Sequence, residues 1–152
     1  MVLASFLTML VGGGGNSSGQ TVVATVRLLA TGEIHGFQLW RLLLRELAIG
    51  AALAVGLGLC AYPRVRLLSA SASDLDALTI SLAYATIVTM ANAIGVLVAM
   101  TLHAIDGLEM ASVGSPPVVQ VTVDVLGVTV TMLLAQAILG EADAVADGRR
   151  TE

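Results

Sequence analysis

The sequence predicts an all-α fold: a polytopic transmembrane helix bundle of about four crossings with a glycine-broken first segment. Of its residues 57% are hydrophobic and only 12% are charged, with a mean hydropathy of +0.92, whereas soluble domains are roughly 25% charged. The 152 residues have room for about four helices of the ~20 residues that a bilayer requires. We expect one transmembrane domain over residues 1–140 and a polar C-terminal tail over residues 141–152, in a plasma or inner membrane.

The charge pattern narrows the class of partner and of activity. Net charge is −4, and the seven basic residues, all arginine, are scattered along the chain. This pattern excludes a nucleic-acid footprint and leaves the lipid bilayer as the expected surroundings. The single cysteine, Cys60, forms no intrachain disulfide and is expected to be a small buried residue. No nucleophile and base stand at a recognisable spacing, so the sequence does not predict an enzyme.

The first segment carries no charge over residues 1–26, which is long enough for one crossing. Four successive glycines, residues 12–15, disfavour an ordinary helix by about 1 kcal/mol each relative to alanine. One interpretation is a broken helix whose glycine break, followed by Asn16 and Gln20, forms part of a pore wall. The other is a close helix crossing through the glycines, with Asn16 bonded to a neighbouring helix.

The next stretch, residues 27–45, mixes charges with leucines. Gly32 is expected to stop the first helix. A short interfacial helix should follow, lying along the membrane with Trp40 at the level of the headgroups. His35 has no second ligand at metal spacing and is expected to be solvated or interfacial.

The second crossing is expected from Leu39 or Glu46 to Tyr62, ended by Pro63. Residues at every fourth position give a stripe that predicts a helix-packing face: Glu46, Gly50, Ala54 and Gly58. Glu46 is expected to pair with an arginine at the membrane edge, and a place at the mouth of an ion path is the alternative.

The third crossing is expected between Asp76 and Asp106, after a loop in which Ser73 or Asp74 caps the helix. A thin stripe of small and polar residues along this helix should face protein rather than lipid. Asn92 lies in the stripe, and an interhelical hydrogen bond is its expected role, with a place on an ion path as the alternative.

The fourth crossing contains Asp124, the single formal charge between Met110 and Gly140. A charge near the middle of the membrane costs on the order of 2.5–3.5 kcal/mol or more, so it needs a reason to be there. One interpretation is a carboxyl that locks two helices together, and the other is a cation path. Gln120, one turn before Asp124, shares its helical face with Gly127 and Thr131.

One carboxylate with neutral oxygens suits Mg²⁺, which keeps most of its waters and needs only one or two acids. A dimer would bring two copies of Asp124 together. A proton relay or a Na⁺ site also needs an acid, and these alternatives stay open.

Four blocks of sequence occur in an order that resembles the membrane domain of the MgtE-type magnesium transporters. They are residues 14–20, residues 27–34, residues 44–50, and Pro117 followed by Asp124. The resemblance implies a homodimeric Mg²⁺ channel or transporter whose ion path follows the dimer interface. It also implies that Asp124 is the central pore acid, that Asn16 lines the same pore, and that Gln120 contacts the hydrated metal.

The family pattern has five crossings and commonly begins with cytoplasmic sensor domains, whereas this chain starts at the second crossing. We therefore expect that gating through sensor domains is missing from this chain, and that a first helix is absent or lies upstream of Met1. The alternative function is a non-transporting membrane subunit, or a remnant of a split transporter, that requires a partner chain to supply the missing helix or sensor domains.

Overall fold

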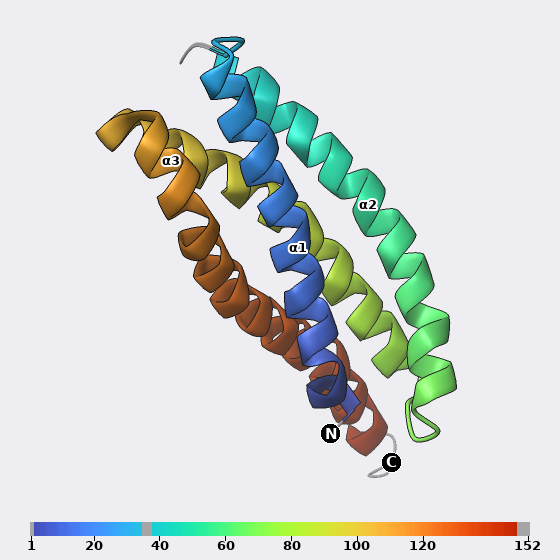
Figure 1. The fold of residues 1–152 in the computed structure, drawn as a ribbon. Helices are drawn as coiled ribbons and strands as arrows, with labels where there is room; N and C mark the ends of the chain where they lie inside the picture. The colour runs from blue at the N-terminus through green and yellow to red at the C-terminus, as the bar shows by residue number, and fades with distance from the viewer. Residues whose placement is uncertain (1, 35–37, 149–152) are drawn as a thin grey trace.

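Three helices make up the fold. The computed structural model describes the backbone of residues 2–34 and 38–148, and the side chains of those up to residue 140. Helix α1 spans Val2–Ala30, α2 spans Leu39–Leu68 and α3 spans Asp74–Gly148. Figure 1 shows them as long rods side by side. Helices α1 and α2 each pack mainly on α3, with little direct contact between them.

Helix α1 runs unbroken through its four glycines, so the predicted glycine break is wrong. The glycines serve close packing instead, which was the second interpretation. Gly13 lies against the phenol ring of Tyr84, and a Cβ on Gly14 would come within 2.6 Å of Ile87 Cγ2 and 2.9 Å of Val123 Cγ1. Packing against α3 therefore offsets the low helix propensity of this stretch.

Gly32 ends the first helix, as predicted. Its φ of 70° is the left-handed conformation that glycine adopts without strain. The amide of Gly32 donates to the carbonyl of Leu29 at 3.2 Å, and the amide of Glu33 donates to the carbonyl of Leu28 at 3.1 Å. These two bonds form a Schellman motif, which satisfies carbonyls at the end of α1.

The prediction of a separate interfacial helix is wrong for the residues that the structure describes. Trp40 lies in the first turn of α2, 65% exposed, and the same helix continues to Leu68. Pro63 lies inside α2 rather than ending it, although proline has no amide to donate to the helix. His35 lies outside the described residues, and so do residues 149–152.

The connection between α2 and α3 is held by side chains. Arg66 Nε lies 3.0 Å from Asp74 Oδ1, and the hydroxyl of Tyr62 donates to the same carboxylate at 3.1 Å. Ser73 caps α3, as predicted: its Oγ accepts from the amide of Asp76 at 3.0 Å, and its own amide donates to Asp76 Oδ2 at 2.9 Å. This reciprocal pair is the arrangement of a capping box.

Ser73→Ala should lower the free energy of unfolding by about 0.5–2 kcal/mol, because the amide of Asp76 loses its capping partner. Thermal unfolding of the detergent-purified protein measures the change. Ser71→Ala is the matched control in the same loop and should stay within about 0.5 kcal/mol of the parent. Equal stability of the two variants would show that the cap contributes nothing.

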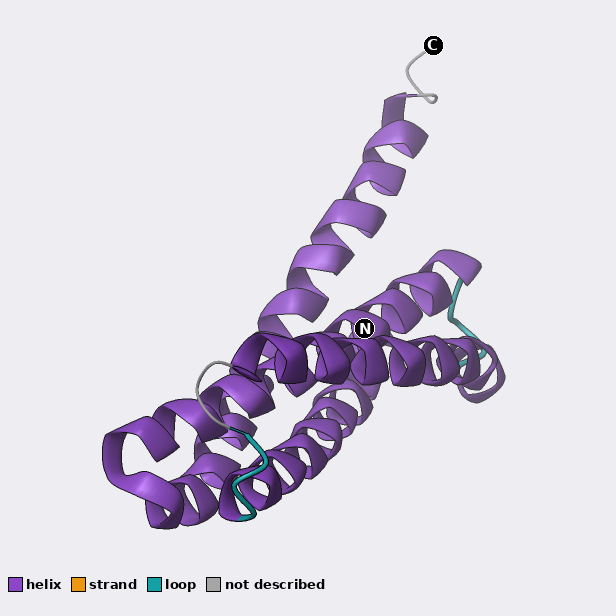
Figure 2. Ribbon diagram, turned by 90° about the horizontal axis from the view of Figure 1, so that it is seen from above, coloured by secondary structure: helices purple, strands orange, loops and turns teal. Residues whose placement is uncertain are grey.

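Helix α3 consists of two limbs. Asp106 (φ −141°, ψ 26°) and Gly107 (φ 74°, ψ −162°) leave helical geometry, and the helix turns back on itself there (Figure 1). We call residues 74–105 the N-terminal limb and residues 108–148 the C-terminal limb. Figure 2 shows that the end of the C-terminal limb extends away from the other helices. The helix continues through residues 141–148 of the expected tail.

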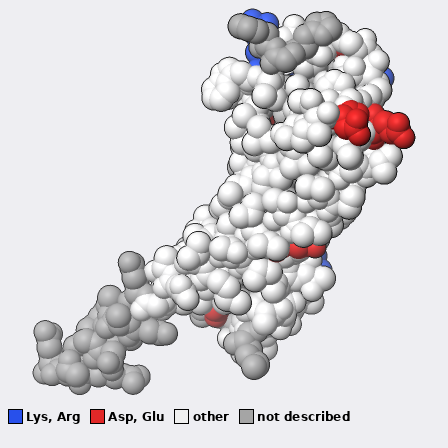
Figure 3. Space-filling model, turned by 90° about the vertical axis from the view of Figure 1, so that its left-hand side faces the viewer, with Lys and Arg blue, Asp and Glu red and all other residues white. Residues whose placement is uncertain are grey.

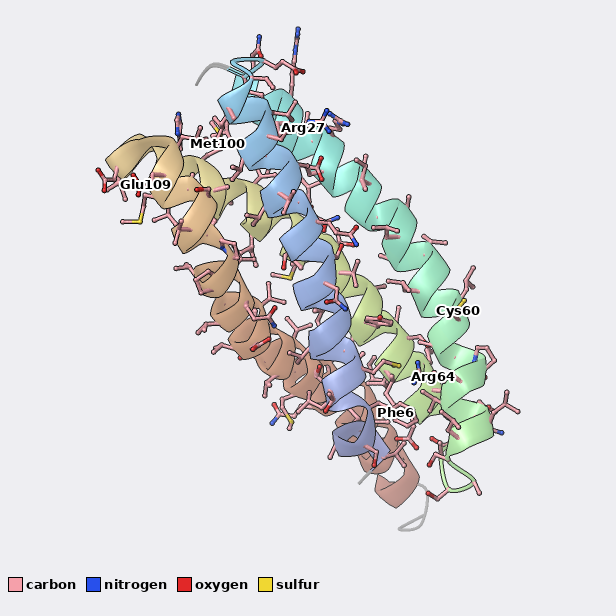
Figure 4. All side chains as sticks on the ribbon, in the orientation of Figure 1. Phe6, Arg27, Cys60, Arg64, Met100 and Glu109 are labelled. Carbon is pink, nitrogen blue, oxygen red and sulfur yellow. The ribbon has the colours of Figure 1, made fainter. Side chains whose placement is uncertain are left out.

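Of the described helices, α2 and α3 are long and apolar enough to cross a membrane. The structure thus supports an all-helical membrane protein, while the count of four crossings stays a prediction. Most of the face in Figure 3 is uncharged, and its acidic side chains form a few separate patches. Arg27 and Arg64 lie toward opposite ends of the bundle in Figure 4. Large apolar side chains are exposed along α2 and α3, as lipid contact requires.

Cys60 is exposed on α2, so its expected burial is wrong. Figure 4 places it on the side of α2 that faces away from the other helices. An apolar run does not distinguish the lipid-facing side of a membrane helix from the side that is packed, because both are apolar.

Candidate cation path

Asp124 lies on the C-terminal limb of α3, with its side chain half-buried. Gln120, one turn earlier, is exposed and donates from Nε2 to Asp124 Oδ1 at 2.6 Å. The predicted pairing of amide and carboxylate on one helical face is therefore present. The bond fixes one carboxylate oxygen and leaves Asp124 Oδ2 and Gln120 Oε1 as acceptors for a cation or its waters.

The amide of Gln120 lies against the glycine run of α1. A Cβ on Gly15 would fall 2.5 Å from Gln120 Oε1 and 2.6 Å from Nε2, so a side chain at this position would displace the amide. Gly127, three residues after Asp124, lies against Val11 in the same way. A Cβ on Gly127 would fall 3.0 Å from Val11 Cγ2. The glycines of α1 and α3 thus set the distance between the acid-bearing limb and α1.

Asn16 follows Gly15 directly, but its side chain lies on a different wall. It is exposed and lines an open groove of about 960 Å³ between α1 and α2, together with Gln20 and Glu46. The described side chains provide no hydrogen bond between Asn16 and either Gln120 or Asp124. Within the single chain, therefore, Gln120 and Asp124 are in contact with each other. Asn16 directly follows the glycine of α1 that Gln120 lies against.

Thr131 was expected to share the face of Asp124. It is buried, and its hydroxyl donates to the carbonyl of Gly127 at 2.7 Å. The side chain is thus satisfied by its own helix, as buried Ser and Thr side chains in helices commonly are.

A second polar cluster lies at the junction of all three helices. Ser17 Oγ donates to Asn92 Oδ1 at 2.6 Å, and Thr21 Oγ1 donates to Glu46 Oε2 at 3.2 Å. The expected interhelical hydrogen bond of Asn92 is confirmed. The stripe of α2 is also a packing face, as predicted, because Glu46, Gly50 and Ala54 are all buried.

Glu46 does not form the expected pair with an arginine. Its side chain is 6% exposed, and Arg66–Asp74 is the single ion pair among the described residues. Sequence reasoning missed Ser17 and Thr21, the partners from α1. A signal was present, since the two hydroxyls stand four residues apart on one helical face.

These groups are oxygen donors, the ligands that hard cations prefer. Among the described residues no three His, Cys, Asp or Glu side chains gather as a metal cluster. Any cation that the chain carries would therefore meet isolated carboxylates and neutral oxygens. This chemistry suits a hydrated or weakly held ion better than a tightly ligated one.

A helical membrane protein with a carboxylate midway along a stretch of helix that is otherwise uncharged, residues 110–140, belongs to the class in which intramembrane acids mark ion pathways. A comparison with protein families specifies the class further, because the divalent cation transporter family MgtE matches residues 7–134. The chain belongs to the MgtE family of divalent cation transporters. A search of curated proteins finds no match.

Proposed function

We propose that the chain is a Mg²⁺ channel or transporter of the plasma or inner membrane, with four crossings and a homodimeric assembly. The hydrated cation would be held by Asp124 from each subunit, with Asn16 and Gln120 shaping the path. The family supports divalent cation transport; the ion, the residues and the dimer are our inference. In this account Mg²⁺ is the transported ion, and no residue has an enzymatic role.

The observation that carries the proposal is the Gln120–Asp124 pair. It stands between Met110 and Gly140, a run without any other formal charge, and it is only partly covered by α1. If the pair served to lock helices together, its carboxylate would be bonded to another helix, yet its hydrogen bond is to Gln120 on the same helix. A carboxylate left open in this way favours an ion path over a structural lock.

Two features support the dimer: the charge that a divalent cation requires, and the apolar side chains exposed around Asp124. One carboxylate neutralises half of a divalent cation, so two copies of Asp124 would balance it. Mg²⁺ dehydrates reluctantly, and paired carboxylates that act through its waters avoid that cost. The limb that bears Asp124 exposes large apolar side chains around the pair, which a second copy or lipid would cover: Val118, Val121, Val125 and Val128.

Four crossings are supported by the kink of α3. The two limbs meet at Asp106 and Gly107, and each is longer than the ~20 residues that a bilayer requires. Helix α1, with 29 residues, is also long enough. Unlike α2 and α3, it contains no stretch apolar enough to count as a candidate span, and its polar side chains include Asn16 and Gln20 at the groove and Ser17 and Thr21 in the polar cluster.

The alternative is a membrane subunit that transports only with a partner chain. The groove between α1 and α2 favours it, because about 960 Å³ of open space lies between helices that barely contact each other. Its lining includes apolar side chains of α1, Val23, Ala24 and Leu28. A helix from another chain would bury them.

Growth of a bacterial strain deficient in magnesium uptake tests the proposal. The parent chain should restore growth at low Mg²⁺, and Asp124→Ala at equal abundance in the membrane should not. Failure of the parent to restore growth would contradict the proposal and favour the partner-dependent subunit. Rescue by both proteins would remove Asp124 from the mechanism.

A further inference from the structure

We propose that Glu46, Thr21 and Ser17 form a second cation site, separate from Asp124, that binds a small monovalent cation of the size of Na⁺. The three residues line a cavity of about 190 Å³ between α1, α2 and the N-terminal limb of α3. Asn92 lines it as well. The inference depends on these side chains alone and does not rest on the proposed role of Asp124.

The first argument is the unbalanced charge of Glu46. The side chain is 94% buried, receives a single hydrogen bond from Thr21, and has no cationic side chain within ion-pair distance among the described residues. A carboxylate buried without a counter-charge is costly by several kcal/mol. A bound cation in the adjoining cavity would remove this cost.

The second argument is the direction of the hydrogen bonds. Thr21 donates its hydroxyl proton to Glu46, and Ser17 donates its own to Asn92 Oδ1. Each hydroxyl oxygen therefore keeps its lone pairs for another partner. The residues that carry these two hydroxyls and the carboxylate line one cavity, and their oxygens are a donor set for a hard cation.

The third argument sets the charge of the ion. A single carboxylate neutralises a monovalent cation, whereas a divalent cation would leave a buried positive charge. Arg45, which is exposed and forms no ion pair with Glu46, also lines the cavity, and its charge would repel a divalent cation twice as strongly as a monovalent one. Mg²⁺ would in addition have to give up tightly held waters to bind between three packed helices.

Access to the site comes from the groove. Gln20, Ala24, Arg45 and Glu46 line both the small cavity and the large groove between α1 and α2. The helices approach each other closely around the cavity, because a Cβ on Gly50 would lie 2.8 Å from Asn92 Nδ2. A cation bound here would link α1 to α2, two helices that otherwise contact each other little.

Thermal unfolding of the detergent-purified chain tests the site. Without Mg²⁺, NaCl should raise the Tm relative to choline chloride at the same ionic strength, saturably and by about 3 °C or more, as expected for a ligand at many times its Kd. KCl should have a smaller effect. Glu46→Gln, which keeps an acceptor for Thr21, and Thr21→Val should both lose the shift.

Two controls separate this site from its surroundings. Thr25→Val makes the same change one turn further along α1, at a buried hydroxyl that has no hydrogen-bond partner, and should keep the Na⁺ shift. Asp124→Ala should also keep the Na⁺ shift. The Na⁺ test therefore gives a clear result even if the proposed transport function is wrong. The proposal is overturned if NaCl does not raise the Tm of the parent above its value in choline chloride, or if Glu46→Gln keeps the increase. It is also overturned if lowering the pH in choline chloride raises the Tm of the parent as much as NaCl does.

Discussion

Asp124→Asn should reduce Mg²⁺ uptake at least tenfold. Asparagine has nearly the same shape, and its Oδ1 still accepts from Gln120 Nε2, so the variant removes the charge while the hydrogen bond at 2.6 Å can persist. A carboxylate about 5 Å from a cation contributes roughly 3 kcal/mol per unit of ion charge at an effective dielectric constant of about 20. A tenfold change corresponds to about 1.4 kcal/mol. Initial uptake rates in cells at matched membrane abundance measure the effect.

Two further variants determine whether charge and position both matter. Asp124→Glu keeps the charge but lengthens the side chain, and should retain a measurable part of the uptake. Asp106→Asn makes the same chemical change at an exposed acid in the kink of α3 and should alter uptake less than about twofold, as expected for an exposed charge that ions in solution screen. Full uptake by Asp124→Asn would rule out an electrostatic role for the acid.

Gly95→Ala should destabilise the fold by about 1–3 kcal/mol, a large effect for one methyl group. The added Cβ would lie 2.9 Å from the backbone oxygen of Ser18 and 3.2 Å from Cβ and Cγ2 of Thr21. A backbone atom cannot rotate away, so α1 has to move from α3. The expected loss opposes helix propensity, which favours alanine over glycine by about 1 kcal/mol.

The matched control for this variant is Gly56→Ala. Gly56 lies inside α2 with nothing within 4 Å of its ideal Cβ position, so the variant should be as stable as the parent or slightly more so. Unfolding of both proteins in the same detergent gives the comparison. If the two variants had equal stability, the close contact of α1 and α3 would be of no energetic importance.

Local signals in the sequence predicted much of the fold. Gly32 and Ser73 were identified from rules that depend only on neighbouring residues, and the structure has a Schellman motif and a capping box there. The stripe from Glu46 to Gly58 was identified from helical periodicity, and its first three residues are buried while Gly58 is half-buried. Such features follow from 3.6 residues per turn and from the partners that helix ends require.

The wrong predictions concern features that tertiary contacts decide. The glycines of α1 have low helix propensity, but their contacts with α3 keep them helical. Trp40 was expected in a separate interfacial helix, and it lies in the first turn of the long helix α2. The exposure of Cys60 could not be predicted either, because an apolar run does not show which side of its helix is packed.

The contacts of the site residues also fall into those that spacing along one helix predicts and those that tertiary packing decides. Gln120 and Asp124 were placed together by their spacing of four residues, and they are hydrogen-bonded. The contact of Glu46 with Thr21 joins two helices, and 25 residues separate the partners in the sequence. Spacing along one helix could not predict that contact. In the proposed dimer, the position of Asn16 relative to the second copy of Asp124 likewise depends on assembly, which periodicity does not specify.

The central claim is that this chain alone conducts Mg²⁺ past Asp124. Its most direct test is Mg²⁺ influx into liposomes that contain only the purified chain, followed with an indicator inside the vesicles. The proposal predicts influx well above that of protein-free liposomes, and a loss of this influx in vesicles that contain Asp124→Asn. Influx no faster than in protein-free liposomes, from a folded parent chain, would contradict it and favour a subunit that requires a partner.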